Sequence, residues 1–159
     1  MIIIINGSIN SGKTTVAKIL WKKILNTAFI DVDKLREFVD WMPGERAFPL
    51  SIENAVLVMM NFVKNNLNVI FTYPLSEKNY VYIMNELKDI HIKIYTFTLN
   101  PSLNNVLTNR GTRKLTEEEI NRIKHHYKVG INKPSFGKII NNTNQTPEET
   151  ANEIITFIK

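Results

Sequence analysis

"GSINSGKT", residues 7–14, follows directly on the apolar run "MIIII" of residues 1–5. The eight residues match the pattern G-x-x-x-x-G-K-[ST] in full, and this pattern is informative when a strand precedes it and a helix follows. Residues 2–5 form a β-branched run typical of a strand buried on both faces of a parallel sheet. Residues 14–25 repeat apolar side chains at helical spacing, so the required strand and helix are both predicted.

The residue types in this loop suit the binding of a nucleotide's phosphates. Gly7 and Gly12 let the backbone curl so that successive N–H groups converge on phosphate oxygens. The positive end of the following helix points to the same place. Lys13 is expected to reach the outer phosphates, and Thr14 to offer its hydroxyl to magnesium. Supporting roles in backbone geometry and hydrogen bonding are expected for Asn10, Ser11 and Thr15.

The rest of the chain alternates between predicted strands and predicted helices. Ser51 is a plausible N-cap of one helix, Asn100 with Pro101 opens another, and capping boxes start two more at Thr116 and Thr146. Strands that alternate with helices imply right-handed crossovers and a mostly parallel sheet covered on both faces. The sequence therefore predicts one α/β domain over residues 1–159, with further strands at residues 28–33, 67–73, 92–99 and 137–141 and a helix at residues 51–63.

Composition limits the possible classes of protein. A chain of 159 residues fits one domain with a substantial core. The lack of cysteine excludes a disulfide framework and a thiolate zinc site, and no apolar run approaches the roughly 18 residues of a membrane span. The N-terminus has no basic leader, so we expect a cytoplasmic protein without a membrane partner. The adjacent His125 and His126 are expected on a wet helix face, and Trp21 in the core.

The positive charge of the chain is concentrated in residues 108–138. This stretch holds eight lysines and arginines and three glutamates, so its net charge of +5 equals that of the whole chain. A basic stretch of this kind suits an anionic partner such as nucleotide phosphates, a phosphorylated substrate or nucleic acid. A solvated basic helix is the alternative interpretation.

Two carboxylates, Asp31 and Asp33, end the second predicted strand. In an open parallel sheet the carboxyl ends of the strands line the ligand crevice, and alternate residues of a strand share a face. Asp33 could accept the proton of an attacking hydroxyl near the γ-phosphate, or serve as a helix cap. Asp31 could help to hold magnesium. Arg36 could bind an anionic group on the acceptor, or pair with a nearby acid.

The loop at residues 7–15, "DVDKLR" at residues 31–36 and "NRGTRK" at residues 109–114 together resemble the small P-loop kinases. This group includes chloramphenicol phosphotransferase, shikimate kinase and gluconate kinase, and the chloramphenicol phosphotransferase-like branch fits best. The resemblance implies a three-layer P-loop NTPase fold with a five-stranded parallel sheet of order 2-3-1-4-5. It also implies ATP- and Mg²⁺-dependent phosphorylation of a hydroxyl on a small molecule.

The resemblance also implies a short lid at about residues 110–118 that bears two arginines. Arg113 is expected to meet the charge that spreads over the transferred phosphoryl group, because planar guanidinium donors suit it. Arg110 lies nearer the preceding helix and is expected to stack on adenine.

The sequence departs from the pattern of these kinases at the end of the third strand. Many of them have an aspartate there that holds magnesium through water, whereas this chain has Thr72. The chain is also short, so residues 34–50 are the main room for a substrate-binding segment. An apolar or aromatic acceptor could bind in a pocket walled by Trp41, Met42, Phe48 and Tyr73, or Trp41 and Phe48 could merely cover the core.

Three function classes stay open at this point. A small-molecule kinase is favoured. For the oligomeric state, a monomer and a homodimer are both possible. A polynucleotide kinase or a sugar-nucleotide kinase similar to zeta toxins shares the aspartate element, but no interleaved aromatic platform for nucleic acid is evident. A degenerate ATP-binding module without efficient turnover is the third class, because of the exchange at Thr72.

Overall fold

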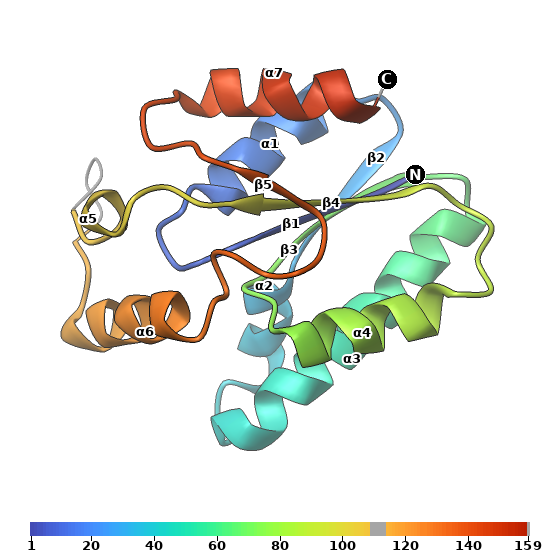
Figure 1. Ribbon diagram of the computed structural model, residues 1–159. Coiled ribbons are helices and arrows are strands. Elements are labelled where there is room, and N and C mark those ends of the chain that lie inside the picture. Colours follow the sequence, from blue (N-terminus) through green and yellow to red (C-terminus); the bar gives the residue numbers. More distant parts are fainter. Residues whose placement is uncertain (109–113, 159) are drawn as a thin grey trace.

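The computed structural model describes residues 1–108 and 114–158. Its centre is a five-stranded parallel sheet in the order β2-β3-β1-β4-β5, which confirms the predicted order (Figure 1). All five predicted strands are present, and they differ from the prediction only at their ends. The strands are β1 (Ile2–Gly7), β2 (Thr27–Asp31), β3 (Asn68–Thr72), β4 (Ile94–Leu99) and β5 (Lys138–Ile140).

Helices cover both faces of the sheet, as Figure 1 shows. Helices α1 and α7 lie on one face, α3 and α4 lie on the other, and α6 lies beside the loop that follows β1. None of the helices among the described residues is long and apolar enough to cross a membrane. The bounds are α1 (Lys13–Lys23), α2 (Val32–Arg36), η1 (Glu37–Val39), α3 (Gly44–Lys64), α4 (Glu77–Leu87), α5 (Leu103–Val106), α6 (Glu117–Lys128) and α7 (Pro147–Ile158).

The central strand β1 explains why both layers are stable. Side chains alternate along a strand, so Ile2 and Ile4 point into the core under α3 and α4, while Ile3 and Ile5 point into the core under α1 and α7. All four side chains are fully buried. A continuous isoleucine run therefore supplies apolar surface to both sides of a parallel sheet.

The end of β1 is fixed by Asn6, a fully buried amide just before the loop of residues 7–14. Its Nδ2 donates to Thr98 Oγ1 at 3.0 Å and to the Ile131 carbonyl at 3.1 Å. Its Oδ1 accepts from the Leu75 N–H at 2.7 Å. Because all of these hydrogen bonds are buried, they hold β4, the segment after β3 and the segment after α6 in fixed positions around the loop.

Several local predictions were wrong. Helix α3 begins at Gly44 and contains Pro49, so Ser51 is not its N-cap and instead donates its buried hydroxyl to the Ala47 carbonyl. The cap of α5 is Ser102 rather than Asn100, and α4 was not predicted at all. Trp21 is 47% exposed, since its indole reaches out to donate to the Thr27 carbonyl.

Candidate functional site

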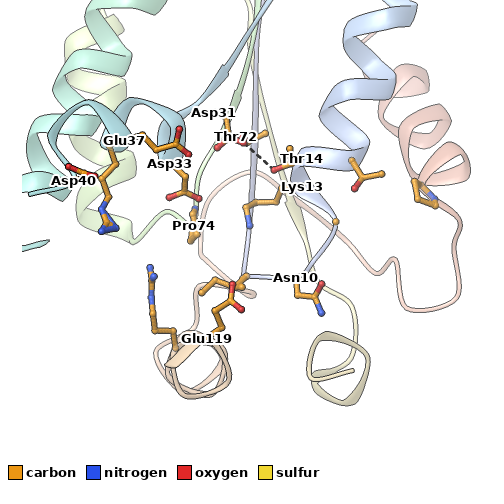
Figure 2. A pocket seen from close by; sticks show the side chains of 16 residues that line it. Asn10, Lys13, Thr14, Asp31, Asp33, Glu37, Asp40, Thr72, Pro74 and Glu119 are labelled. Atoms are coloured by element: carbon orange, nitrogen blue, oxygen red, sulfur yellow. Dashed lines mark hydrogen bonds between the residues drawn. The ribbon is translucent and has the colours of Figure 1, made fainter. Parts of the chain in front are cut away.

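A cavity of about 710 Å³ opens at the carboxyl ends of β1, β2 and β3 (Figure 2). The order of the sheet reverses at β1, which lies between β3 and β4, and such a switch point is where open α/β sheets bind ligands. The cavity therefore lies where the topology predicts a ligand. Its lining residues are Ile9, Asn10, Gly12, Lys13, Thr14, Thr15, Asp31, Asp33, Arg36, Glu37, Asp40, Thr72, Pro74, Glu119, Arg122 and Pro147.

The loop of residues 7–14, here called the P-loop, has the backbone that its glycines predict. Gly7 has φ +143° and Gly12 has φ +96°, and Asn10 adopts φ +62° between them. A Cβ on Gly7 would lie 2.6 Å from the Leu99 carbonyl oxygen, so only glycine fits between the loop and β4. Helix α1 starts directly after Gly12, and its N-terminus faces the cavity without a side-chain cap from the described residues. This arrangement suits an anion.

Contacts from distant segments hold the P-loop in place. Lys13 Nζ donates to the Ser8 carbonyl at 2.7 Å and bridges the loop from within. Asn10 Nδ2 donates to the carbonyls of Val106 at 2.8 Å and Thr108 at 3.0 Å. Asn142, buried in the segment after β5, donates to the Ser11 carbonyl at 3.0 Å. The loop is thus preorganised by the ends of other elements.

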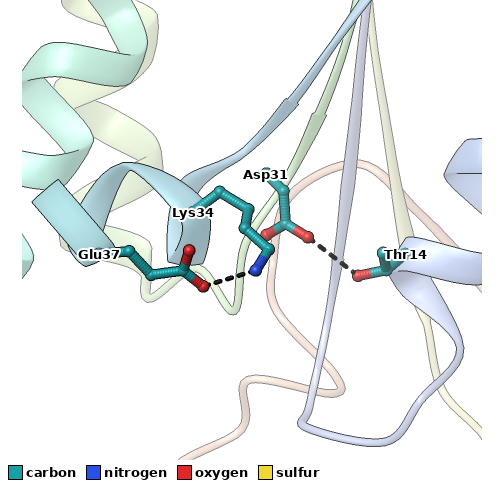
Figure 3. Close-up of polar contacts among 4 residues, drawn as sticks. All are labelled: Thr14, Asp31, Lys34 and Glu37. Carbon is teal, nitrogen blue, oxygen red and sulfur yellow. Dashed lines mark hydrogen bonds and ion pairs between the residues drawn. The ribbon is translucent and has the colours of Figure 1, made fainter.

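Oxygen atoms from three elements meet beside the start of α1. Thr14 Oγ1 donates to Asp31 Oδ2 at 3.3 Å, as Figures 2 and 3 show. Asp31 pairs with Thr72 in the register of β2 and β3, and the buried Thr72 hydroxyl has no hydrogen-bond partner among the described residues. Burial raises the pKa of the Asp31 carboxyl, and the nearby Asp33 raises it further, against the hydrogen bond from Thr14. Hard oxygen ligands of this kind fit Mg²⁺.

The second carboxylate, Asp33, reaches the cavity from a helix and not from a strand. Strand β2 stops at Asp31 and α2 begins at Val32, so the strand alternation assumed for the two aspartates does not hold. The helix also places Asp31 at the N-cap position, which removes the alternative that Asp33 caps it. Asp33 is exposed and lines the cavity together with Lys13 (Figure 2).

Helix α6 brings residues to the site that the sequence did not single out. Glu119 and Arg122 line the cavity, and His126 continues the same helical stripe. His126 Nδ1 lies 3.2 Å from the buried Ser8 Oγ of the P-loop. Burial lowers the pKa of His126 to about 4, and the positive charges of Lys13 and Arg122 lower it in the same direction. The expectation of a wet helix face holds for His125 but is wrong for His126.

The sequence contains a signal for the stripe of residues 119, 122 and 126, but the signal can be interpreted only once the fold is known. The capping box at Thr116 fixed the start of the helix, and residues 119, 122 and 126 follow at helical spacing. The sequence does not say which side of the helix faces the P-loop. Of the basic residues in the described part of the segment 108–138, Arg122 is the one that lines the cavity.

Some expected site residues lie elsewhere. In the described part of the chain, Trp41 and Tyr73 are not among the lining residues. Trp41 is 75% exposed, and Tyr73 is buried in the core under α3 and α4. Arg110 and Arg113 lie outside the described residues, as do residues 110–113 of the expected lid as a whole. The expected substrate segment, residues 34–50, comprises most of α2, η1 and the first turns of α3, and Arg36 is its expected member in the cavity.

Comparison with known proteins finds similarity in structure. No protein-family model and no curated protein matches the sequence. The tunicamycin resistance protein of Deinococcus radiodurans aligns with a TM-score of 0.70 and 18% identity over 99% of this chain and 94% of that chain. A Janibacter sugar kinase aligns with a TM-score of 0.75 and 14% identity over 99% of this chain and 93% of that chain.

Shikimate kinase from Aquifex aeolicus also shares the arrangement. It aligns with a TM-score of 0.61 and 18% identity over 99% of this chain and 96% of that chain. Its alignment and the others run through the sheet, the P-loop and the helices on both faces, since each covers nearly the whole of both chains. The chain therefore has the fold of the P-loop kinases.

Proposed function

We propose that this protein is an ATP- and Mg²⁺-dependent phosphotransferase that moves the γ-phosphate to a hydroxyl of a small molecule. One observation carries the proposal. A single cavity joins the P-loop, with Lys13 and Thr14, to Asp33, a carboxylate that belongs to a different element. A binding loop alone would serve any nucleotide-binding protein, whereas a carboxylate across the cavity suits the activation of an acceptor.

The P-loop would hold the phosphates of ATP. The backbone N–H groups of the loop and the uncapped start of α1 supply donors and a positive field. Lys13, which now donates to the Ser8 carbonyl, is close enough to the loop to turn toward the outer phosphates instead. The neutral His126 against Ser8 would keep the loop's shape during this exchange.

Thr14 and Asp31 would hold Mg²⁺, with the Thr72 hydroxyl available to a water of its coordination shell. When bound, the ion neutralises charge on the phosphates. The raised pKa of Asp31 reflects its burial and its neighbour Asp33, and a bound cation would favour the carboxylate form.

Asp33 would then act on the acceptor. Its carboxylate accepts the proton of the acceptor hydroxyl while the hydroxyl oxygen forms a bond to the γ-phosphorus. The bond from that phosphorus to the oxygen shared with the β-phosphate breaks, and ADP leaves with the electron pair. We place Arg113 on the transferred phosphoryl group and Arg110 on the adenine as further parts of the proposal.

The test is a transfer assay with γ-labelled ATP, Mg²⁺ and a pool of acceptors that includes sugars, hydroxy acids, nucleosides, aminoglycosides, phenicols and short oligonucleotides. Label in a small molecule is the expected result, and Lys13→Ala should abolish both labelling and the stabilisation of the fold by Mg-ATP. Label on oligonucleotide ends would instead favour a polynucleotide kinase. Stabilisation by Mg-ATP with no transfer to any acceptor would argue for a module that binds nucleotide without turnover.

A further inference from the structure

Two arginines from separate elements meet on one aromatic ring beside the cavity. Arg36 comes from α2, Arg122 comes from α6, and both line the cavity. The Cζ atom of Arg36 lies 5.2 Å from the centroid of the Phe48 ring, and that of Arg122 lies 5.9 Å from it. The face of an aromatic ring attracts a cation at such distances, so Phe48 holds two like charges near each other.

Neither guanidinium group is neutralised by an acid in the described part of the chain. Glu37, the acid next to Arg36 in sequence, forms its ion pair with Lys34, and this is the ion pair found among the described residues (Figure 3). Both arginines are half-buried, and Arg36 Nε is buried without a hydrogen-bond partner among the described residues. A buried donor without an acceptor is costly, and so are two cations that share one ring without a counter-charge. An anion that accepts from both groups would remove both costs.

This pair of cations lies next to the proposed base. Arg36 follows Asp33 by three residues, so both project from one side of α2. Asp33, Arg36 and Arg122 all line the same cavity, so one small molecule held there can contact the carboxylate and the two arginines.

We propose that the acceptor carries a carboxylate or phosphate group beside its reactive hydroxyl, and that Arg36 and Arg122 bind this anionic group on the platform of Phe48. That the bound anion belongs to a phosphate acceptor rests on the proposed kinase function, whereas the anion site itself follows from the positions of Arg36, Arg122 and Phe48. Planar guanidinium groups bind carboxylates and phosphates with paired hydrogen bonds, so the site would select charged hydroxy acids or phosphate esters over neutral alcohols.

The first experiment tests the anion site without any turnover. The P-loop is filled with Mg²⁺ and a non-hydrolysable ATP analogue, and the arginine Nε–H signals are followed by NMR as acetate or inorganic phosphate is added. We expect saturable shifts at Arg36 and Arg122, and affinity that falls roughly 10- to 100-fold in Arg36→Gln and in Arg122→Gln. Arg46→Gln is the matched control, because Arg46 is exposed and lies in the neighbouring α3. Equal responses in all variants, or no saturable shift, would overturn the inference.

The second experiment uses matched acceptors in the transfer assay, such as gluconate, glucose 6-phosphate and glucose. Preference for one charged acceptor identifies the carboxylate or the phosphate as the bound group, and the two arginine variants should raise its KM while the KM for ATP stays constant. Phe48→Leu should also raise the acceptor KM with little change in kcat, as expected of a positioning residue.

The two proposals fail in different ways. Transfer to a neutral acceptor that proceeds equally well in Arg36→Gln and Arg122→Gln would overturn the anion site while the kinase function stands. A loss of kcat with unchanged acceptor KM in Arg122→Gln would also overturn it, because the guanidinium would then act on the transferred phosphoryl group. Saturable anion binding without transfer to any acceptor would count against the kinase and leave the anion site in place.

Discussion

Asp33 is the residue on which the proposed chemistry depends most directly. Asp33→Asn keeps the size of the side chain but removes the base, so we expect kcat to fall by roughly 10²- to 10⁴-fold. The affinity for Mg-ATP should change little, since the proposed contacts to the phosphates and Mg²⁺ come from the P-loop and Asp31, which this substitution leaves in place. Steady-state kinetics and ATP titration measure the two quantities, with the exposed Asp89→Asn as the control. An unchanged kcat would exclude Asp33 as the base.

His126 should make the stability of the protein depend on pH. The folded pKa is about 4, and the unperturbed value is 6.5, so the unfolded chain takes up this proton more readily. The free energy of unfolding is therefore unaffected by His126 above about pH 7, and it declines as the pH falls from 6.5 toward 4. We expect a loss of about 1 to 2 kcal/mol, because partial exposure of the ring reduces the effect.

Urea unfolding at several pH values measures this effect of His126. In His126→Asn the decline between pH 6.5 and 4 should shrink, while the exposed His91→Asn should keep it. If both variants show the same slope as the parent protein, other groups carry the pH dependence, and the ring against Ser8 has no such role.

At the scale of elements, the short strand β5 depends on one glycine. Gly137 precedes β5 with φ +69°, and a Cβ there would lie 2.7 Å from the Thr96 carbonyl oxygen of β4. The strand matters to the site because Asn142, just beyond it, holds the Ser11 carbonyl of the P-loop. Only a residue without a side chain lets the two backbones approach so closely.

Gly137→Ala should lower the free energy of unfolding by roughly 2 to 4 kcal/mol, because the left-handed conformation and the backbone clash both oppose it. Gly130 is the matched control, since it also has positive φ, at +83°, but no atom of the described residues lies within 4 Å of its added Cβ. Gly130→Ala should therefore cost only about 1 to 2 kcal/mol. Chemical denaturation measures both, and equal losses would show that the contact with Thr96 is relieved by a small shift.

At the scale of the whole molecule, two cores lie on opposite faces of one sheet. Ile83 of α4 belongs to the core under α3 and α4, and Ile154 of α7 belongs to the core under α1. Both side chains are fully buried. Because β1 contributes to both cores, the two layers should unfold together in one cooperative transition.

Ile83→Val and Ile154→Val should each lower the free energy of unfolding by about 0.5 to 1.5 kcal/mol. The double variant should show the sum to within about 0.5 kcal/mol, since the sheet separates the two sites. Thermal and urea unfolding of the four proteins measure this. Two separated transitions, or a large departure from additivity, would mean that the layers do not behave as one cooperative unit.

The sequence determined by itself the features that depend on local patterns. The isoleucine run predicts β1, G-x-x-x-x-G-K-T predicts the glycine conformations of the P-loop, and the capping box predicts the start of α6. Where local signals conflicted, prediction failed. Gly44 and Pro49 argue against a helix, yet burial of Ala47 and Ser51 makes their segment the first turns of α3.

Only the tertiary structure decided which distant residues share the cavity. The pairing of β2 with β3 sets Asp31 beside Thr72, and the placement of α6 brings Arg122 to Arg36 and His126 to Ser8. These contacts join residues far apart in the chain, and no local pattern contains them. They follow from the way helices bury their apolar faces on a sheet, because that packing fixes which polar side of each helix turns toward the P-loop.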